Sequence, residues 1–117
     1  MKWLADDCFH NDILRGLLRR SPDLDLIRAQ DVAEIAGRDD GKLIVWATEN
    51  ERVLLTHDLA TMVRAFLLQR QQQPACTPVV LVPDSLPVGL VIEEILLLDQ
   101  CSDESDWAAG AVYLPLQ

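Results

Sequence analysis

Short apolar runs alternate with longer amphipathic stretches along this 117-residue chain. The apolar runs are expected as strands at residues 2–5, 24–29, 52–56, 79–82 and 110–116. Strands whose residues are apolar almost throughout are typical of a parallel sheet that helices cover on both faces. The pattern therefore predicts an α/β protein, a three-layer α/β/α sandwich around a mainly parallel, five-stranded sheet.

The stretches between these strands have helical spacing of their apolar residues. Helices are expected at residues 11–20, 40–50, 58–73 and 86–101. Residues 30–40, which include Gly37, are expected as a short helical or loop segment, and residues 102–106 (SDESD) as a solvated turn. No internal repeat divides the chain, and its length suits one compact domain over residues 1–117.

The expected helix at 86–101 is more apolar than a helix with one buried face requires. Its apolar residues are Leu86, Val88, Leu90, Val91, Ile92, Ile95, Leu96, Leu97 and Leu98. Two interpretations follow: the surplus packs against a second copy in a homodimer, or the helix is deeply buried within its own fold.

Composition excludes several classes of protein. No apolar run approaches the roughly 20 residues of a membrane span, and no signal-peptide pattern opens the chain, so a cytoplasmic protein without a membrane partner is expected. The three cysteines, Cys8, Cys76 and Cys101, include no C-x-x-C pair, which argues against a zinc ribbon. They are expected as small core residues.

The formal net charge is −9, and the last basic residue is Arg70. An acidic protein binds nucleic acid poorly without local cations, because the phosphate backbone must be neutralised. A nucleic-acid role would therefore require a local arginine patch or bound metal ions.

Acidic residues follow the strands at recurring places. Asp6 and Asp7 end the first strand, Asp58 comes two residues after the third, and Asp40 opens the helix between. The carboxyl ends of parallel strands share one edge of the sheet, so Asp6, Asp40 and Asp58 are expected to face one crevice. Each also has a simpler interpretation, as a strand end or a helix N-cap.

Several carboxylates in one crevice repel one another, by roughly 4 kcal/mol for a pair at ~4 Å and an effective dielectric of 20. Such a cluster relaxes by binding a cation or by holding a proton. Mg²⁺ or Mn²⁺ suits carboxylate oxygens and water as ligands, and such an ion can promote phosphodiester hydrolysis.

The same acids mimic those of a response-regulator receiver domain, which has paired acids after its first strand and a phosphorylated Asp after its third. A receiver also needs a lysine after its last strand. The lysines of this chain are Lys2 and Lys42, so the acyl phosphate would have no such partner. The receiver interpretation is therefore disfavoured.

Two segments carry a resemblance to a known family. "MKWLADDCF" and "DDGKLIVWATENERVLLTHD" resemble the opening and the central motif of short PIN-like proteins, and the closing "W…VYLPL" resembles their C-terminus. The resemblance implies a PIN-like sheet with strand order 3-2-1-4-5. It also implies a Mg²⁺- or Mn²⁺-dependent ribonuclease. Many bacterial members are VapC-like toxins held by a small antitoxin protein, which implies a toxin–antitoxin pair.

Carried over by position, the resemblance makes Asp6, Asp40 and Asp58 the metal-binding and catalytic acids. Thr56 would support the site by hydrogen bonding, and Asp7 stands where the family often has Glu. In the ribonuclease hypothesis, single-stranded or structured RNA would meet the side chains of Arg15, Arg19 and Arg38.

The chain also departs from the family pattern. Ala60 occupies the position of a further acid, and Cys8 stands where Asn is common. Two functions follow from these residues: a metal-dependent ribonuclease, or a PIN-like domain with weakened or lost activity that serves as a binding module.

Overall fold

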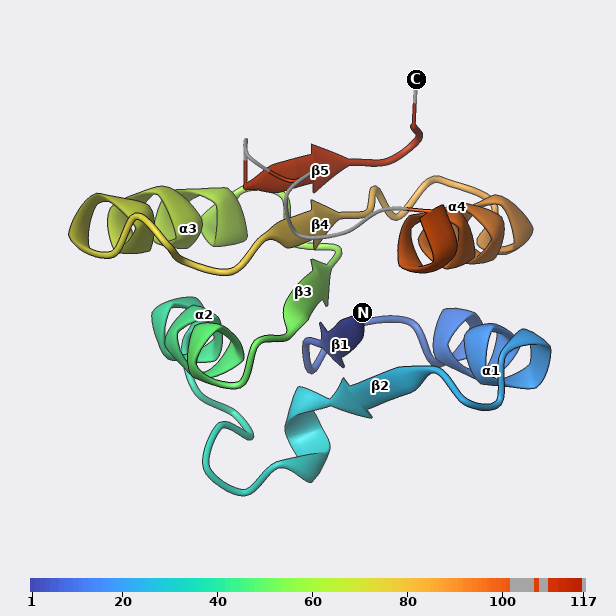
Figure 1. Ribbon diagram of the computed structural model, residues 1–117, viewed down its shortest axis with the longest axis horizontal. Coiled ribbons are helices and arrows are strands. Elements are labelled where there is room, and N and C mark those ends of the chain that lie inside the picture. The colour runs from blue at the N-terminus through green and yellow to red at the C-terminus, as the bar shows by residue number, and fades with distance from the viewer. Residues whose placement is uncertain (102–106, 108–109, 117) are drawn as a thin grey trace.

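The computed structural model describes residues 1–101, 107 and 110–116, and its five strands form one parallel sheet (Figure 1). The strands are β1 (Lys2–Ala5), β2 (Asp25–Arg28), β3 (Val53–Thr56), β4 (Val79–Leu81) and β5 (Ala111–Tyr113). Each lies within a predicted strand, and the predicted α/β class is confirmed.

Helices cover both faces of the sheet. They are α1 (Asn11–Arg20), the 3₁₀ helix η1 (Ala29–Asp31), α2 (Asp40–Glu49), α3 (Thr61–Gln72) and α4 (Val88–Cys101). Figure 1 shows α1 and α4 together on one side, and α2 and α3 on the other. The three-layer arrangement is therefore confirmed, while the turn expected at residues 102–106 lies outside the described residues.

The strand order β2-β1-β3-β4-β5 corrects the expected order 3-2-1-4-5. β1 pairs with β2 on one side and directly with β3 on the other, with Trp3 opposite Val53 and Ala5 opposite Leu55. An apolar run fits a strand at any interior position, so the sequence pattern does not encode which strands pair. From β1 the chain adds β2 on one side, and it then crosses to add β3, β4 and β5 on the other side. Open α/β sheets place their ligand sites at such a switch point, which here lies between β1 and β3.

Alternation along the two central strands divides the core into two layers. Trp3 and Ala5 of β1 point into the layer under α1 and α4, whereas Leu4 points into the layer under α2 and α3. In β3, Leu55 belongs to the first layer and Leu54 to the second. All five side chains are fully buried, so the sheet centre is apolar on both faces.

Most of the apolar surplus of α4 packs within this fold. Val91, Ile92, Ile95 and Leu96 are buried, and Ile92 lies so close to α1 that a Cβ on Gly16 would meet its side chain. Leu97 and Val88 are the large apolar side chains of α4 that remain exposed. This burial supports the second of the two interpretations of the helix, and a homodimer stays a prediction.

Two of the three cysteines differ from their expected core role. Cys8 and Cys101 are exposed free thiols, whereas Cys76 is half-buried and packs against the core layer under α2 and α3. The turn after β1 and the end of α4 leave the first two at the surface. Among the described helices, none has both the length and the apolar character to cross a membrane.

Candidate functional site

The predicted acids meet at the carboxyl edge of β1 and β3. Side chains alternate between the two faces along each strand. Asp6 and Thr56 therefore lie on the face of Leu4 and Leu54, which α2 and α3 cover. Both helices begin at this edge, because each follows a strand and runs back along the sheet. Asp40 is the first residue of α2, and Asp58 stands three residues before the first residue of α3.

The side chain of Asp6 is a buried carboxylate that accepts two hydrogen bonds. Its Oδ1 accepts a hydrogen bond from the backbone N–H of Cys8 at 2.9 Å, and its Oδ2 accepts one from the hydroxyl of Thr56. Burial raises the pKa of Asp6, and the nearby charge of Asp40 raises it further, against the lowering effect of the two hydrogen bonds. Thr56 is itself completely buried and also accepts from the N–H of Asp58 at 3.0 Å.

Asp58 and Asp40 are joined through a residue that the sequence did not single out. The carboxylate of Asp58 accepts hydrogen bonds from both the backbone N–H and the hydroxyl of Thr61, and these bonds lower the pKa of Asp58. The same hydroxyl lies 2.9 Å from Oδ2 of Asp40. Thr61 therefore contacts two of the three predicted acids. Ser and Thr are common where helices begin, so only the tertiary contact distinguishes it.

The hydroxyl of Thr61 lies between the carboxylates of Asp40 and Asp58. It carries one hydrogen, which it directs to one carboxylate at a time or shares between the two.

The three acids offer the ligand type that a hard divalent cation prefers, but in the described residues their oxygen atoms are not all within 4.8 Å of one another. Asp6, Asp40 and Asp58 supply carboxylate oxygens from three separate elements, the ligand type that Mg²⁺ and Mn²⁺ prefer. Within the described part of the chain, none of the three forms an ion pair with a basic side chain. A bound cation would relieve both the buried charge of Asp6 and the repulsion from Asp40.

Asp7 lies beside this cluster and turns to another partner. Its Oδ2 accepts from the backbone N–H of Gly37 at 3.1 Å, which ties the end of β1 to the loop before α2. Its Oδ1 is buried without a hydrogen-bond partner. Asp7 therefore contacts the loop that leads to Asp40, and the supporting role expected of it beside Thr56 stays a prediction.

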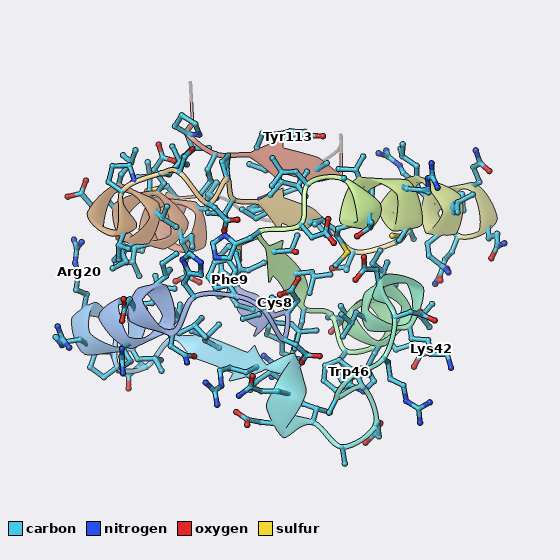
Figure 2. The ribbon with its side chains drawn as sticks, turned by 180° about the vertical axis from the view of Figure 1, so that it is seen from behind. Cys8, Phe9, Arg20, Lys42, Trp46 and Tyr113 are labelled. Atoms are coloured by element: carbon cyan, nitrogen blue, oxygen red, sulfur yellow. The ribbon has the colours of Figure 1, made fainter. Side chains whose placement is uncertain are left out.

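The arginines predicted to contact RNA are spread over different regions. Arg15 pairs with Asp12 at 2.5 Å within α1, and Arg38 lies in the loop that ends at Asp39, the N-cap of α2. Arg19 is in the last turn of α1, which runs away from the carboxyl edge, and Figure 2 shows its neighbour Arg20 at that remote end. The structure therefore brings Arg38 near the edge that carries the acids and does not bring Arg19 there.

A second cluster at the same edge consists of His10, His57 and Asp84, whose ligand atoms lie within 4.8 Å of one another. Nδ1 of His57 lies 2.8 Å from the carbonyl oxygen of Val82, so it carries the hydrogen, and Nε2 accepts from the N–H of His10 at 3.2 Å. Both ring nitrogens are engaged, and no lone pair is left for a metal.

His57 instead joins three loops. Its ring stacks on Phe9 with centroids 4.3 Å apart, and its hydrogen bonds reach the loops after β1 and β4. It points toward α1 and α4, because it follows Thr56 by one residue and the faces alternate. It holds the turn carrying Asp6 in place without entering the carboxylate cluster.

The sheet order alone would also suit a receiver domain, since flavodoxin-like folds share it. The chemistry does not. Lys2 begins β1 at the opposite edge, and Figure 2 shows Lys42 on the outer side of α2. The described end of β5 offers no lysine to an acyl phosphate.

No family model matches this chain, and comparisons with curated proteins and with solved structures give no significant match.

Proposed function

We propose that this chain is a metal-dependent ribonuclease of the PIN-like type. The observation that supports this most directly is the convergence of Asp6, Asp40 and Asp58, each joined to the next through Thr56, Thr61 or electrostatic interaction. The motif resemblance is independent of that geometry and selects the same three acids.

A divalent cation held by these carboxylates would supply an activated water and counter-charge for the phosphodiester. The residues of the chain prepare its site. Thr56 fixes the carboxylate of Asp6 through its hydroxyl and orients the backbone of Asp58. Burial of Asp6 excludes water from one side of the cluster, so charges there interact more strongly than on the surface.

Substrate binding belongs to the same proposal. An RNA backbone reaching the carboxyl edge would meet Arg38 before α2 and Arg15 in α1. The remaining elements rest on the resemblance alone: a cytoplasmic bacterial protein, a toxin role, and a small antitoxin as partner.

A second candidate function is an RNA-binding module without cleavage. Ala60 favours it, because this exposed residue, the N-cap of α3, stands at the position where the family has a further acid. With one carboxylate fewer, the cluster would hold a cation less tightly than a site of four acids.

The test compares the purified protein with Asp6→Asn on single-stranded RNA in Mn²⁺. Asp23→Asn is the matched control, since Asp23 is exposed between α1 and β2, away from the carboxyl edge. Cleavage by wild type and by Asp23→Asn but not by Asp6→Asn is expected. Equal residual cleavage in all three proteins would refute the ribonuclease. Metal-independent RNA binding without cleavage would establish the binding module.

A further inference from the structure

A groove runs along the outer edge of the sheet at β2. This strand is the last in the sheet order, and within the described residues β1 is the strand that pairs with it (Figure 1). The groove has a volume of about 300 Å³ and lies between α1, β2 and the segment around the end of η1. Most of its lining is apolar, and the lining residues are Leu14, Leu18, Leu26, Ile27, Arg28, Asp31 and Val32.

The groove reaches both faces of the sheet at this edge. Leu26 packs against the core layer under α1 and α4, and Ile27 packs against the layer under α2 and α3. Both side chains are only half-buried, and Leu18 is 41% exposed. A chain seated in the groove would therefore contact apolar side chains on both faces and the outward N–H and C=O groups of β2 between them. An extended strand added to a sheet edge uses both kinds of contact.

The charged residues of β2 are held within the chain. Sheet edges are commonly protected from further pairing by charged side chains. Asp25 at one end of β2 is paired with Arg52 at 2.8 Å. Arg28 at the other end donates to Asn11 at 2.7 Å and to Asp31 at 3.1 Å. The two residues between them are apolar, so the middle of this edge carries no charge that would oppose a further strand.

The rim of the groove on α1 is basic. Arg15 and Arg19 each follow a lining leucine by one position, so they form a second row along the helix beside the leucines. Arg15 pairs with Asp12 on the surface, where such pairs are weak and easily exchanged. Within the described residues, Arg19 forms no ion pair. This rim favours an acidic occupant on a chain whose own net charge is −9.

Other occupants fit the groove less well. A second copy joined at β2 by a two-fold axis would place its own α1 on the same face, so the arginine rows of the two copies would face each other. An RNA strand would satisfy the arginines with its phosphates, but it would leave the apolar lining without a partner.

We propose that the β2 edge binds an extended, acidic segment of a partner protein, which adds a further strand to the five-stranded sheet. The apolar side chains of the segment fill the groove, and its carboxylates pair with Arg19 and, by exchange, with Arg15. None of the acids Asp6, Asp40 and Asp58 takes part, so this inference does not rest on the proposed ribonuclease.

The probe is a capped synthetic peptide in which alternating valines and leucines lie between pairs of glutamates. It is titrated into the isotope-labelled 117-residue chain, and NMR gives the affinity and the site of binding. Binding should slow hydrogen exchange of the β2 amides that face away from β1. A peptide with proline at its centre should bind about tenfold more weakly, because proline donates no backbone hydrogen bond. A peptide with lysine in place of each glutamate should also bind more weakly.

Two substitutions with matched controls separate packing from charge. Leu18→Ser removes a lining side chain, and Leu67→Ser makes the same change at an exposed leucine of α3. Arg19→Glu reverses the charge of the rim, and Arg64→Glu makes the same change at an exposed arginine of α3. Leu18→Ser and Arg19→Glu should each weaken binding of the acidic peptide about fivefold, and the two controls should change it less than about twofold.

Several results would overturn the proposal. One is the absence of binding at about 1 mM peptide, and another is equal affinity of wild type and Leu18→Ser. If a single-stranded RNA oligomer protects the β2 amides and the acidic peptide does not, the groove is a nucleic-acid surface and the proposal is wrong. If wild type sediments as a dimer and Leu18→Ser as a monomer, a second copy occupies the edge and the proposal is equally wrong.

Discussion

The substitution Thr56→Val probes the hydrogen bonds that hold the site together without removing any acid. The Thr56 side chain is completely buried, and valine fills the same volume. Its hydroxyl donates to the carboxylate of Asp6 and accepts from the N–H of Asp58. The change therefore leaves a buried carboxylate and a backbone N–H each short of one partner.

A hydrogen bond to a charged group stabilises a protein by about 1.5–3 kcal/mol and a neutral one by about 0.5–1.5 kcal/mol. Together they predict that Thr56→Val lowers the free energy of unfolding by about 2–4 kcal/mol at neutral pH. This is a large fraction of the roughly 5–15 kcal/mol that stabilises a typical domain. Thr56→Ser keeps the hydroxyl and loses one buried methyl group, so it should cost about 1 kcal/mol.

The penalty should also depend on pH. Burial raises the pKa of Asp6, so the folded chain holds this proton more tightly than the unfolded chain does. The contribution of Asp6 to stability is therefore greatest at acidic pH and is lost as the pH rises through its folded pKa. The Thr56 hydroxyl counteracts this by lowering the pKa of Asp6, and valine removes that effect. The penalty of Thr56→Val should be smaller near about pH 4, the ordinary pKa range of Asp, than at neutral pH.

Urea unfolding followed by tryptophan fluorescence measures both effects, since Trp3 and Trp107 are buried in the core. The m-value should stay constant while the midpoint falls. A penalty below about 0.5 kcal/mol at neutral pH, or an equal penalty for Thr56→Ser and Thr56→Val, would refute the reasoning.

Further predictions concern the pH dependence of metal binding and two glycines. Mn²⁺ affinity should fall as the pH is lowered from neutral toward the raised pKa of Asp6, because a proton then competes with the cation. Titration by electron paramagnetic resonance at several pH values measures this affinity, and an affinity that does not change with pH would contradict Asp6 as a ligand. Gly110 has φ of 79°, and a Cβ there would lie 2.5 Å from the ring of Phe66, so Gly110→Ala should destabilise the fold by about 2–4 kcal/mol. Gly37 has φ of 72° in open space, so Gly37→Ala should cost only about 1 kcal/mol; thermal unfolding of both variants compares them, and equal losses would show that packing against Phe66 contributes nothing.

Local signals in the sequence anticipated much of the site. Asp6 and Asp58 follow apolar runs that are too short for helices, and the rule that parallel strands end at one edge brought them together with Asp40. The structure confirms that these acids lie at one edge. His57, one residue before Asp58, lies on the other face, against Phe9, because neighbouring strand residues alternate between the faces.

Other features depend on contacts between distant segments, which no local pattern reports. Thr61 is an ordinary helix-start residue until α2 brings Asp40 within 2.9 Å of its hydroxyl. Cys8 was expected in the core, yet the turn that aims Asp6 inward leaves it exposed. Arg19 is close to Asp6 in the sequence, but it lies in the last turn of α1, and α1 runs from the carboxyl edge toward the opposite edge of the sheet.

The sequence by itself determined the class of fold, because apolar runs and helical periodicity require a parallel sheet covered on both faces. It also determined which acids end the strands. Only the tertiary structure decided that β1 pairs with β3, since any apolar strand satisfies an interior position and the choice among partners depends on how all the helices pack together. That choice places Asp6 beside Thr56 and Asp58, because β1 and β3 end next to each other at the carboxyl edge.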